Sequence, residues 1–89
     1  MAIVFGRRKS AANEKLRGLP FELVEEFDWS NALIVEDRRF AYPERRFPAL
    51  GAIAGVLHMV VCTCAGEDIR VISLRRASRK ERKRYGEKT

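Results

Sequence analysis

The sequence predicts an α+β fold, in which two N-terminal helices pack on a four-stranded antiparallel sheet and a basic helix ends the chain. Helix-forming residues occupy the first third of the chain, short apolar runs separated by turn residues follow, and cations crowd the end. The connections between the apolar runs are short enough for neighbouring antiparallel strands. A chain of 89 residues is too short for two cores, so we expect one domain over residues 1–89.

The N-terminal region indicates an edge strand followed by the two helices. Residues 1–5 suit a short strand, and residues 7–17 are mostly good helix formers. Gly18 stands where a helix-capping glycine belongs, and Pro20 suits the first turn of a second helix. The second helix is expected to bury apolar residues at three-residue spacing, namely Phe21, Val24 and Phe27.

Turn residues separate four predicted strands in the second half of the chain. The strands are expected over residues 32–36, 45–50, 56–63 and 69–75. Turns are expected at 51–55 and 65–68, where glycines occur. Side chains alternate between the two faces of a strand, so Arg70 should share a face with the apolar Ile72 and Leu74. An arginine in such a row usually has a buried partner or a ligand.

A capping box predicts the last helix. Ser78 and Glu81 have the spacing at which a serine and a glutamate satisfy two free amides at a helix start, so a helix should run from about residue 79 to residue 85. Only Ala77 and Tyr85 could anchor it. We therefore expect a loosely attached basic element that a partner could displace.

The charge of the chain is concentrated at its C-terminal end. The net charge is +6, from 18 Lys and Arg against 12 Asp and Glu. Residues 70–89 hold nine cations and two glutamates, a charge of +7, so the other 69 residues carry −1. Like charges this close repel one another unless an anionic partner binds them. This distribution favours nucleic acid as the partner over a merely solvated charged helix.

Several classes of protein and site are excluded. No apolar run approaches the roughly 20 residues of a membrane span, and the N-terminus lacks the form of a signal peptide. We therefore expect no membrane partner and a cytoplasmic location. Two cysteines and one histidine cannot fill a structural zinc site, and no cofactor is expected. His58 lies within an apolar strand and is interpreted as structural, and Cys62 and Cys64 as packing residues.

The C-terminal segment resembles a known family. Residues 69–85 read IRVISLRRASRKERKRY. This run is similar to I-R-I-I-S-A-R-x-A-[ST]-x-x-E-R-x-x-Y, the signature of BrnT-type toxins, which are the ribonuclease partners of bacterial type II toxin–antitoxin pairs. Lys9 and Asn13 match a further K-x-x-x-N element of the family. The chain departs from the family at Leu74, where a small residue is usual, and at Leu16-Arg17, where Lys-His is common.

The resemblance implies a fold similar to RelE-type ribonucleases and a cytoplasmic enzyme that inhibits growth and translation by cleaving RNA. It also implies neutralisation by a ribbon-helix-helix antitoxin similar to BrnA, which would in addition bind the operator DNA. Two other functions stay open from the residues alone. One is a module that binds RNA or DNA without cutting it, and the other is a structural partner of a DNA-binding protein.

RNA cleavage needs no metal, because the 2′-hydroxyl of the substrate can attack its own phosphate. Arg46, Arg70 and Arg75 are the predicted phosphate clamp, since a guanidinium grips two oxygens and stays protonated. Glu44 either acts as general base or orients Arg46 through an ion pair. Tyr85 stacks on a base, donates a proton or simply anchors its helix. The cations expected to contact RNA are Lys9, Arg17, Arg76, Arg79, Arg82 and Lys83.

Overall fold

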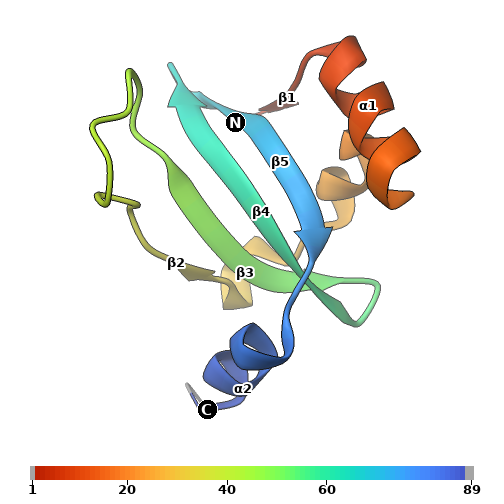
Figure 1. Ribbon diagram of the computed structural model, residues 1–89, viewed down its shortest axis with the longest axis vertical. Helices are drawn as coiled ribbons and strands as arrows, with labels where there is room; N and C mark the ends of the chain where they lie inside the picture. The colour runs from red at the N-terminus through yellow and green to blue at the C-terminus, as the bar shows by residue number, and fades with distance from the viewer. Residues whose placement is uncertain (1, 88–89) are drawn as a thin grey trace.

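A five-stranded mixed sheet forms the centre of the computed structural model, which describes residues 2–87 (Figure 1). The strands are β1 (Ile3–Val4), β2 (Leu33–Ile34), β3 (Phe47–Ile53), β4 (Val56–Ala65) and β5 (Asp68–Arg76). Their order across the sheet is β1-β5-β4-β3-β2. The helices are α1 (Arg7–Arg17), α2 (Arg79–Glu87) and two short 3-10 helices, η1 (Phe21–Glu26) and η2 (Trp29–Asn31).

The predicted four-stranded antiparallel sheet is wrong in strand number and in orientation. Strand β1 adds a fifth strand, which runs parallel to β5, whereas the other neighbouring pairs are antiparallel. Ile3 pairs with Ile69, and the Ile69 amide donates to the carbonyl of Ala2 at 2.9 Å. Without β1 this edge of β5 would present unpaired peptide groups. The partner comes from the opposite end of the chain, so no local pattern indicates it.

The second predicted N-terminal helix is also wrong, because residues 21–26 form the 3-10 helix η1. A 3-10 helix has three residues per turn, so side chains three apart lie on one line. The spacing of Phe21, Val24 and Phe27 fits that repeat better than the 3.6-residue repeat of an α-helix. All three side chains are buried. The predicted apolar stripe is therefore confirmed, and only the type of helix differs.

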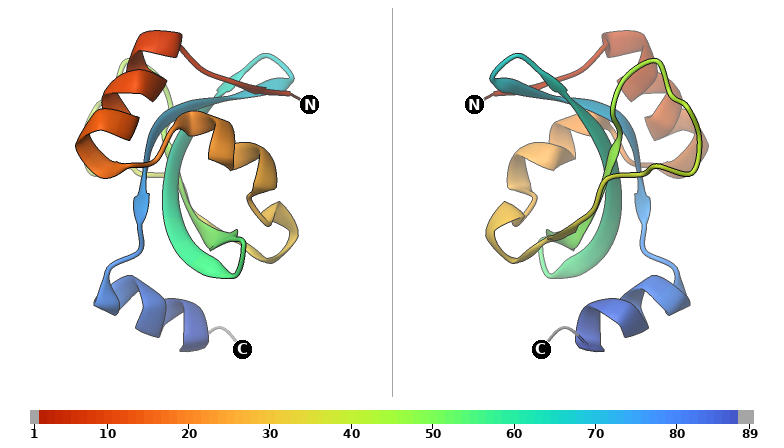
Figure 2. Two further views of the ribbon diagram at one scale, coloured as in Figure 1. Left: turned by 90° about the vertical axis from the view of Figure 1, so that its right-hand side faces the viewer. Right: turned by 90° about the vertical axis from the view of Figure 1, so that its left-hand side faces the viewer.

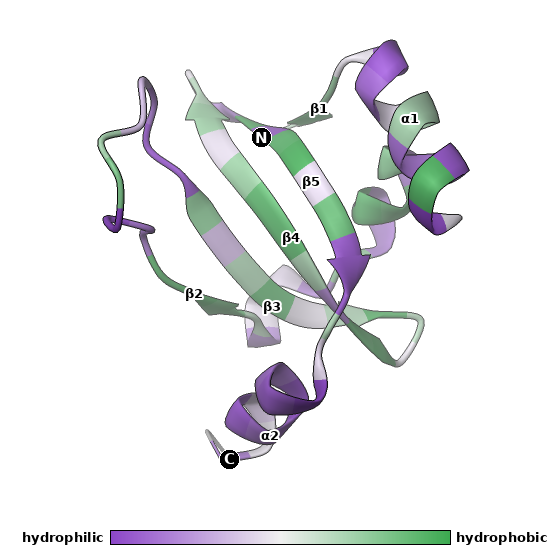
Figure 3. Ribbon diagram, viewed as in Figure 1, coloured by the Kyte–Doolittle hydropathy of each residue, from purple (hydrophilic) through white to green (hydrophobic). Residues whose placement is uncertain are grey.

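The main core lies between η1 and the back of the sheet. Figure 2 shows η1 and η2 on one side of the sheet and the loop that joins β2 to β3 on the other. Phe21, Leu74 and Val60 are at most 1% exposed in this core. A smaller cluster of Leu50, Met59 and Ala77 lies on the front of the sheet, where α2 covers one end. In Figure 3 the strands are mostly hydrophobic and α2 is hydrophilic.

The hairpin between β3 and β4 is tighter than predicted. Strand β3 continues to Ile53, so the turn consists of Ala54 and Gly55, with φ of 49° and 79°. Two successive residues with positive φ match the right-handed twist of a two-residue hairpin. Gly51 lies inside β3, where a Cβ would come within 2.7 Å of the Phe27 ring. The predicted turn at 51–55 is therefore too long: Gly51 is a packing residue inside β3, and only Gly55 belongs to the turn.

A β-bulge changes which side chains share a face of β5. Val61 pairs with Ser73 and Cys62 pairs with Val71, so Ile72 is an extra residue in β5. One extra residue reverses the alternation beyond it. Leu74 consequently joins Val71 in the core behind the sheet. The prediction that Leu74 shares a face with Arg70 is wrong for this reason.

Asn13 joins α1 to the sheet, and its loss should destabilise the fold. Its side-chain amide donates to the carbonyls of Leu19 at 2.6 Å and Leu74 at 2.9 Å. Asn13→Ala leaves both partly buried acceptors without this donor, so we expect the free energy of unfolding to fall by about 1–3 kcal/mol. Urea unfolding measures the loss. Glu14→Ala, on the exposed side of α1, is the control, and an equal effect of the two variants would contradict the role of Asn13.

Candidate functional site

The front of the sheet carries a row of polar side chains at one end. Phe47 pairs with Cys62, so the preceding residue, Arg46, lies at the level of Thr63, whose partner on β5 is Arg70. The Cα atoms of Arg46 and Arg70 are therefore two strand spacings apart, about 10 Å. Arg75 pairs with Met59, four residues further along β4, which is about 13 Å from this row. The structure thus brings Arg46 and Arg70 together and places Arg75 at the other end.

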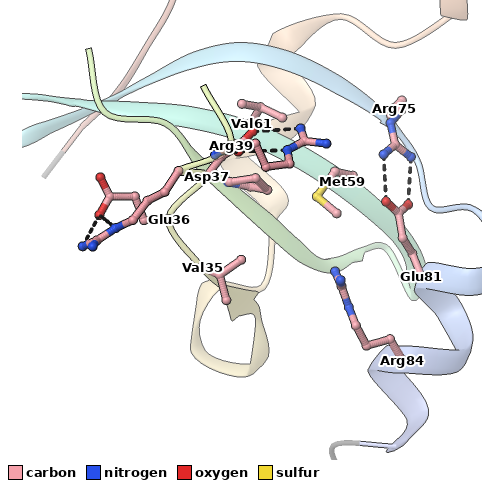
Figure 4. A pocket seen from close by; sticks show the side chains of 11 residues that line it. Val35, Glu36, Asp37, Arg39, Met59, Val61, Arg75, Glu81 and Arg84 are labelled. Atoms are coloured by element: carbon pink, nitrogen blue, oxygen red, sulfur yellow. Dashed lines mark hydrogen bonds and ion pairs between the residues drawn. The ribbon is translucent and has the colours of Figure 1, made fainter. Parts of the chain in front are cut away.

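A groove of about 440 Å³ runs over the front of the sheet toward α2 (Figure 4). Its floor is apolar and consists of Pro48, Met59 and Val61. One wall is the start of the loop after β2, from Val35 to Arg39. The opposite wall comes from β5 and α2 and contains Arg75, Glu81 and Arg84. A pocket of this size is within the range that holds small organic ligands.

Arg75 is held in the groove by a bidentate ion pair with Glu81. Both guanidinium NH2 groups lie 2.8 Å from the carboxylate oxygens. Glu81 also accepts from the Ser78 amide at 2.9 Å, and the Glu81 amide donates to the Ser78 hydroxyl at 3.1 Å, as the capping box predicts. Hydrogen bonding from Arg75 lowers the pKa of Glu81 to about 2. The carboxylate therefore stays ionised at neutral pH.

The ion pair should stabilise the protein in a pH-dependent way that Glu81→Gln removes. The folded pKa of Glu81 is about 2, below its ordinary value of 4.5. Its stabilising contribution is therefore complete above pH 4.5 and is lost as the pH falls toward 2. We expect wild type to be more stable than Glu81→Gln at pH 6, and the difference to shrink by pH 3. Urea unfolding at both pH values measures it, and a constant difference would argue against the pair.

The other wall of the groove is stiffened by ion pairs within its own loop. Asp37 accepts from Arg39 Nε at 3.0 Å and from the Tyr42 hydroxyl at 2.9 Å, and these contacts lower its pKa. Glu36 is paired with Arg45 at 2.8 Å, which lowers the pKa of this carboxyl to about 2. Both carboxylates are thus ionised and already neutralised by arginines of the same loop.

Glu44 pairs with Arg70, so the ion pair with Arg46, one of the two roles predicted for Glu44, is wrong. Arg46 instead stacks on Tyr42, with the guanidinium carbon 4.5 Å from the ring centroid. Its Nε atom is buried and has no hydrogen-bond partner within residues 2–87. Arg46 thus has one unused donor, and it projects from the same row of the sheet as Arg70.

Tyr85 and the remaining predicted RNA contacts are spread over the two α-helices and the end of β5. Tyr85 is half-buried beside the front cluster, and its hydroxyl donates to the Asn31 carbonyl at 3.1 Å, so it does anchor α2. Arg82 donates to the Ala77 carbonyl at 3.1 Å. The other predicted contacts are exposed and do not line the groove: Lys9 and Arg17 on α1, and Arg76, Arg79 and Lys83 at the C-terminal end.

Arg75 is the one charged residue of the groove lining that the sequence predicts as a site residue. The six others are not predicted: Glu36, Asp37, Arg38, Arg39, Glu81 and Arg84. The capping box could have found two of them. It fixes which side of α2 carries Glu81, and residues three apart in a helix lie on the same side. Once Glu81 is known to face the sheet, Arg84 must lie near it. Arg39 belongs to an irregular loop, and nothing in its neighbourhood indicates which way it points.

The interpretation of His58 as structural is confirmed, because it is 5% exposed and its Nδ1 lies 2.7 Å from the Val56 carbonyl. Cys62 is buried, which raises its pKa to about 11, whereas Cys64 is exposed and is not a packing residue. Within residues 2–87 no three Asp, Glu, His or Cys side chains gather at a common point. In the same range no helix is long and apolar enough to cross a membrane.

The fold and this groove define a class: a small α+β protein with arginines gathered on one face of its sheet. Comparison with known proteins narrows the class. The model of the family described as the ribonuclease toxin BrnT of type II toxin–antitoxin systems matches residues 5–81. The chain therefore belongs to the BrnT family, as the C-terminal signature predicted.

A solved structure supports the same assignment. The chain is similar to the Brucella abortus ribonuclease toxin BrnT, whose crystal structure was determined at 1.1 Å resolution. The two share 26% sequence identity with a TM-score of 0.70, and the match covers 89% of this chain and 99% of the other. A search of curated proteins found no match.

Proposed function

We propose that this protein is a metal-independent endoribonuclease toxin, which acts in the cytoplasm and inhibits growth and translation by cleaving RNA. The observation that carries the proposal is the row on the front of the sheet, where Arg46 and Arg70 lie on either side of Thr63. Membership of a family of ribonuclease toxins supports it. The similar Brucella protein is likewise described as a ribonuclease toxin.

The proposed reaction is attack of the 2′-oxygen on the adjacent phosphorus. The bond from phosphorus to the 5′-oxygen breaks, and the departing 5′-oxygen takes a proton from water, which leaves a 2′,3′-cyclic phosphate and a 5′-hydroxyl. Negative charge grows on the phosphoryl oxygens in the transition state, and Arg46 and Arg70 stabilise it. Glu44 is held by Arg70 in the free protein. It either accepts the 2′-hydroxyl proton or keeps Arg70 in position until RNA arrives.

Arg75 has a different role in this proposal, because it is too far along the sheet to share a phosphate with Arg46 and Arg70. It contacts a neighbouring part of the RNA chain at the α2 end of the groove. Exposed cations of α2, such as Arg79 and Lys83, attract the RNA phosphates. This attraction weakens with rising salt concentration and does not depend on the nucleotide sequence.

Incubation of the pure protein with single-stranded RNA in excess chelator tests the proposal. We expect fragments that end in 2′,3′-cyclic phosphate, and none from RNA whose 2′-hydroxyls are methylated. RNA that is bound but left intact by folded protein would contradict the enzyme and favour the non-catalytic binding module. Neither binding nor cleavage would favour a structural partner of a DNA-binding protein.

We further propose that a ribbon-helix-helix antitoxin, similar to BrnA, neutralises the protein and links it to operator DNA. The type II toxin family implies an antitoxin partner. The antitoxin is expected to cover the groove together with Arg46 and Arg70. A complex in which both arginines stay open to solvent would contradict this mode of neutralisation.

A further inference from the structure

The groove holds one cation that no carboxylate within residues 2–87 neutralises. Its lining contains four arginines and three carboxylates, which leaves one net positive charge. Arg39 is paired with Asp37 and Arg75 with Glu81, and Arg38 shares Glu36 with Arg45, so three of the four lining arginines contact a carboxylate. The fourth arginine is Arg84, which makes no ion pair in the described part of the chain.

Arg84 is directed into the groove by the helix that carries it. It follows Glu81 by three residues on α2, so both side chains lie on the same side of the helix. Figure 4 shows the Arg84 guanidinium reaching from α2 toward the floor at Met59, beside the Arg75–Glu81 pair. A guanidinium without an ion pair at the rim of a hollow has the chemistry to bind a single anion.

The floor beneath Arg84 is apolar and belongs to the sheet. Pro48 and Val61 are half-buried, and Met59 is 5% exposed, so these side chains form a firm surface. The groove thus combines an apolar floor with one positive charge that no ion pair in the described residues compensates. A nucleotide has the complementary chemistry, because its base has two apolar faces and its phosphodiester carries one negative charge.

We propose that the groove binds one nucleotide of single-stranded RNA, with the base on the floor at Met59 and Val61 and the phosphate on Arg84. The inference rests on the proposed function and deepens it, because it assigns a substrate-binding site beside the row that holds Arg46 and Arg70. An acidic peptide fits less well, since several carboxylates would meet the three that already line the walls.

Titration of the isotope-labelled protein with nucleoside 3′-monophosphates, followed by NMR, tests the site. We expect the amides of Met59 and Val61 to shift, and Arg84→Ala to weaken binding about tenfold or more. Arg84→Lys should retain part of the affinity because the charge remains. Lys80→Ala removes a charge from the same helix outside the groove and should bind like wild type. Arg84 makes no described side-chain contact that the fold would lose.

Two further ligands test which part of a nucleotide the site recognises and whether it prefers a peptide. Inorganic phosphate should bind much more weakly than the nucleotide, and equal binding would overturn the role of the floor. A hexaglutamate peptide should not compete. Shifts produced by that peptide and not by the nucleotides would overturn the proposal and indicate a protein partner.

RNA cleavage by the same variants separates this inference from the proposed function. If wild type cleaves RNA and Arg84→Ala cleaves it with an unchanged KM, the nucleotide site is wrong and the ribonuclease proposal stands. If wild type leaves RNA intact but binds nucleotides in a manner that depends on Arg84, the ribonuclease proposal is wrong and the nucleotide site stands.

Discussion

Arg70→Ala and Arg46→Ala are each expected to slow RNA cleavage by about 10²- to 10³-fold, which corresponds to about 3–4 kcal/mol of transition-state stabilisation. The effect is large because each variant removes a fixed charge from the place where the phosphoryl oxygens become more negative. Both positions lie at the front of the sheet beside Thr63. The measurement is the single-turnover rate with saturating protein, in chelator, so that weaker binding does not hide the chemical step.

The controls distinguish a slower chemical step from a general loss of positive charge and from unfolding of the variant. Arg8→Ala removes an exposed cation from α1 and should cleave RNA at the wild-type rate. Arg70→Lys keeps the charge but loses the bidentate geometry, so its rate should fall between those of wild type and Arg70→Ala. Unfolding curves confirm that each variant is folded at the assay temperature. Arg70→Ala with the rate of Arg8→Ala would contradict the proposed role.

The three long strands could be predicted from the sequence because their signals are local. Alternating apolar residues and the glycines at 55 and 66 placed β3, β4 and β5 to within a few residues. The misses have causes that are not local. The edge strand predicted at residues 1–5 is present as β1, but its parallel pairing depends on a partner 66 positions away, and the bulge at Ile72 has no signature of its own. The 3-10 helix η1 presents a stripe that an α-helix would also present.

The candidate site was predictable in its arginines but not in their partners. The C-terminal signature singles out Arg70 and Arg75, and both lie on the front of the sheet. Their partners are set by tertiary structure: Glu44 is 26 residues from Arg70 and belongs to an irregular loop. No pattern in that loop indicates that Glu44 pairs with Arg70, or that Arg46 stacks on Tyr42.

Phe21→Ala is expected to cost about 3–5 kcal/mol of unfolding free energy, the largest loss of stability from one core substitution. The ring is 1% exposed and packs edge-on against Phe5, with centroids 5.9 Å apart. A domain of 89 residues has a total stability of about 5–13 kcal/mol. The variant should therefore unfold at a much lower urea concentration than wild type.

Leu16→Ala is the matched control, because Leu16 is 76% exposed on α1 and its loss should change the stability by less than about 0.5 kcal/mol. Equal losses in the two variants would contradict the position of the core behind the sheet. Phe21 and the groove lie on opposite faces of that sheet. Cleavage per folded molecule of Phe21→Ala, measured at low temperature, should therefore equal that of wild type, whereas Arg70→Ala should remain folded and cleave RNA about 10²- to 10³-fold more slowly.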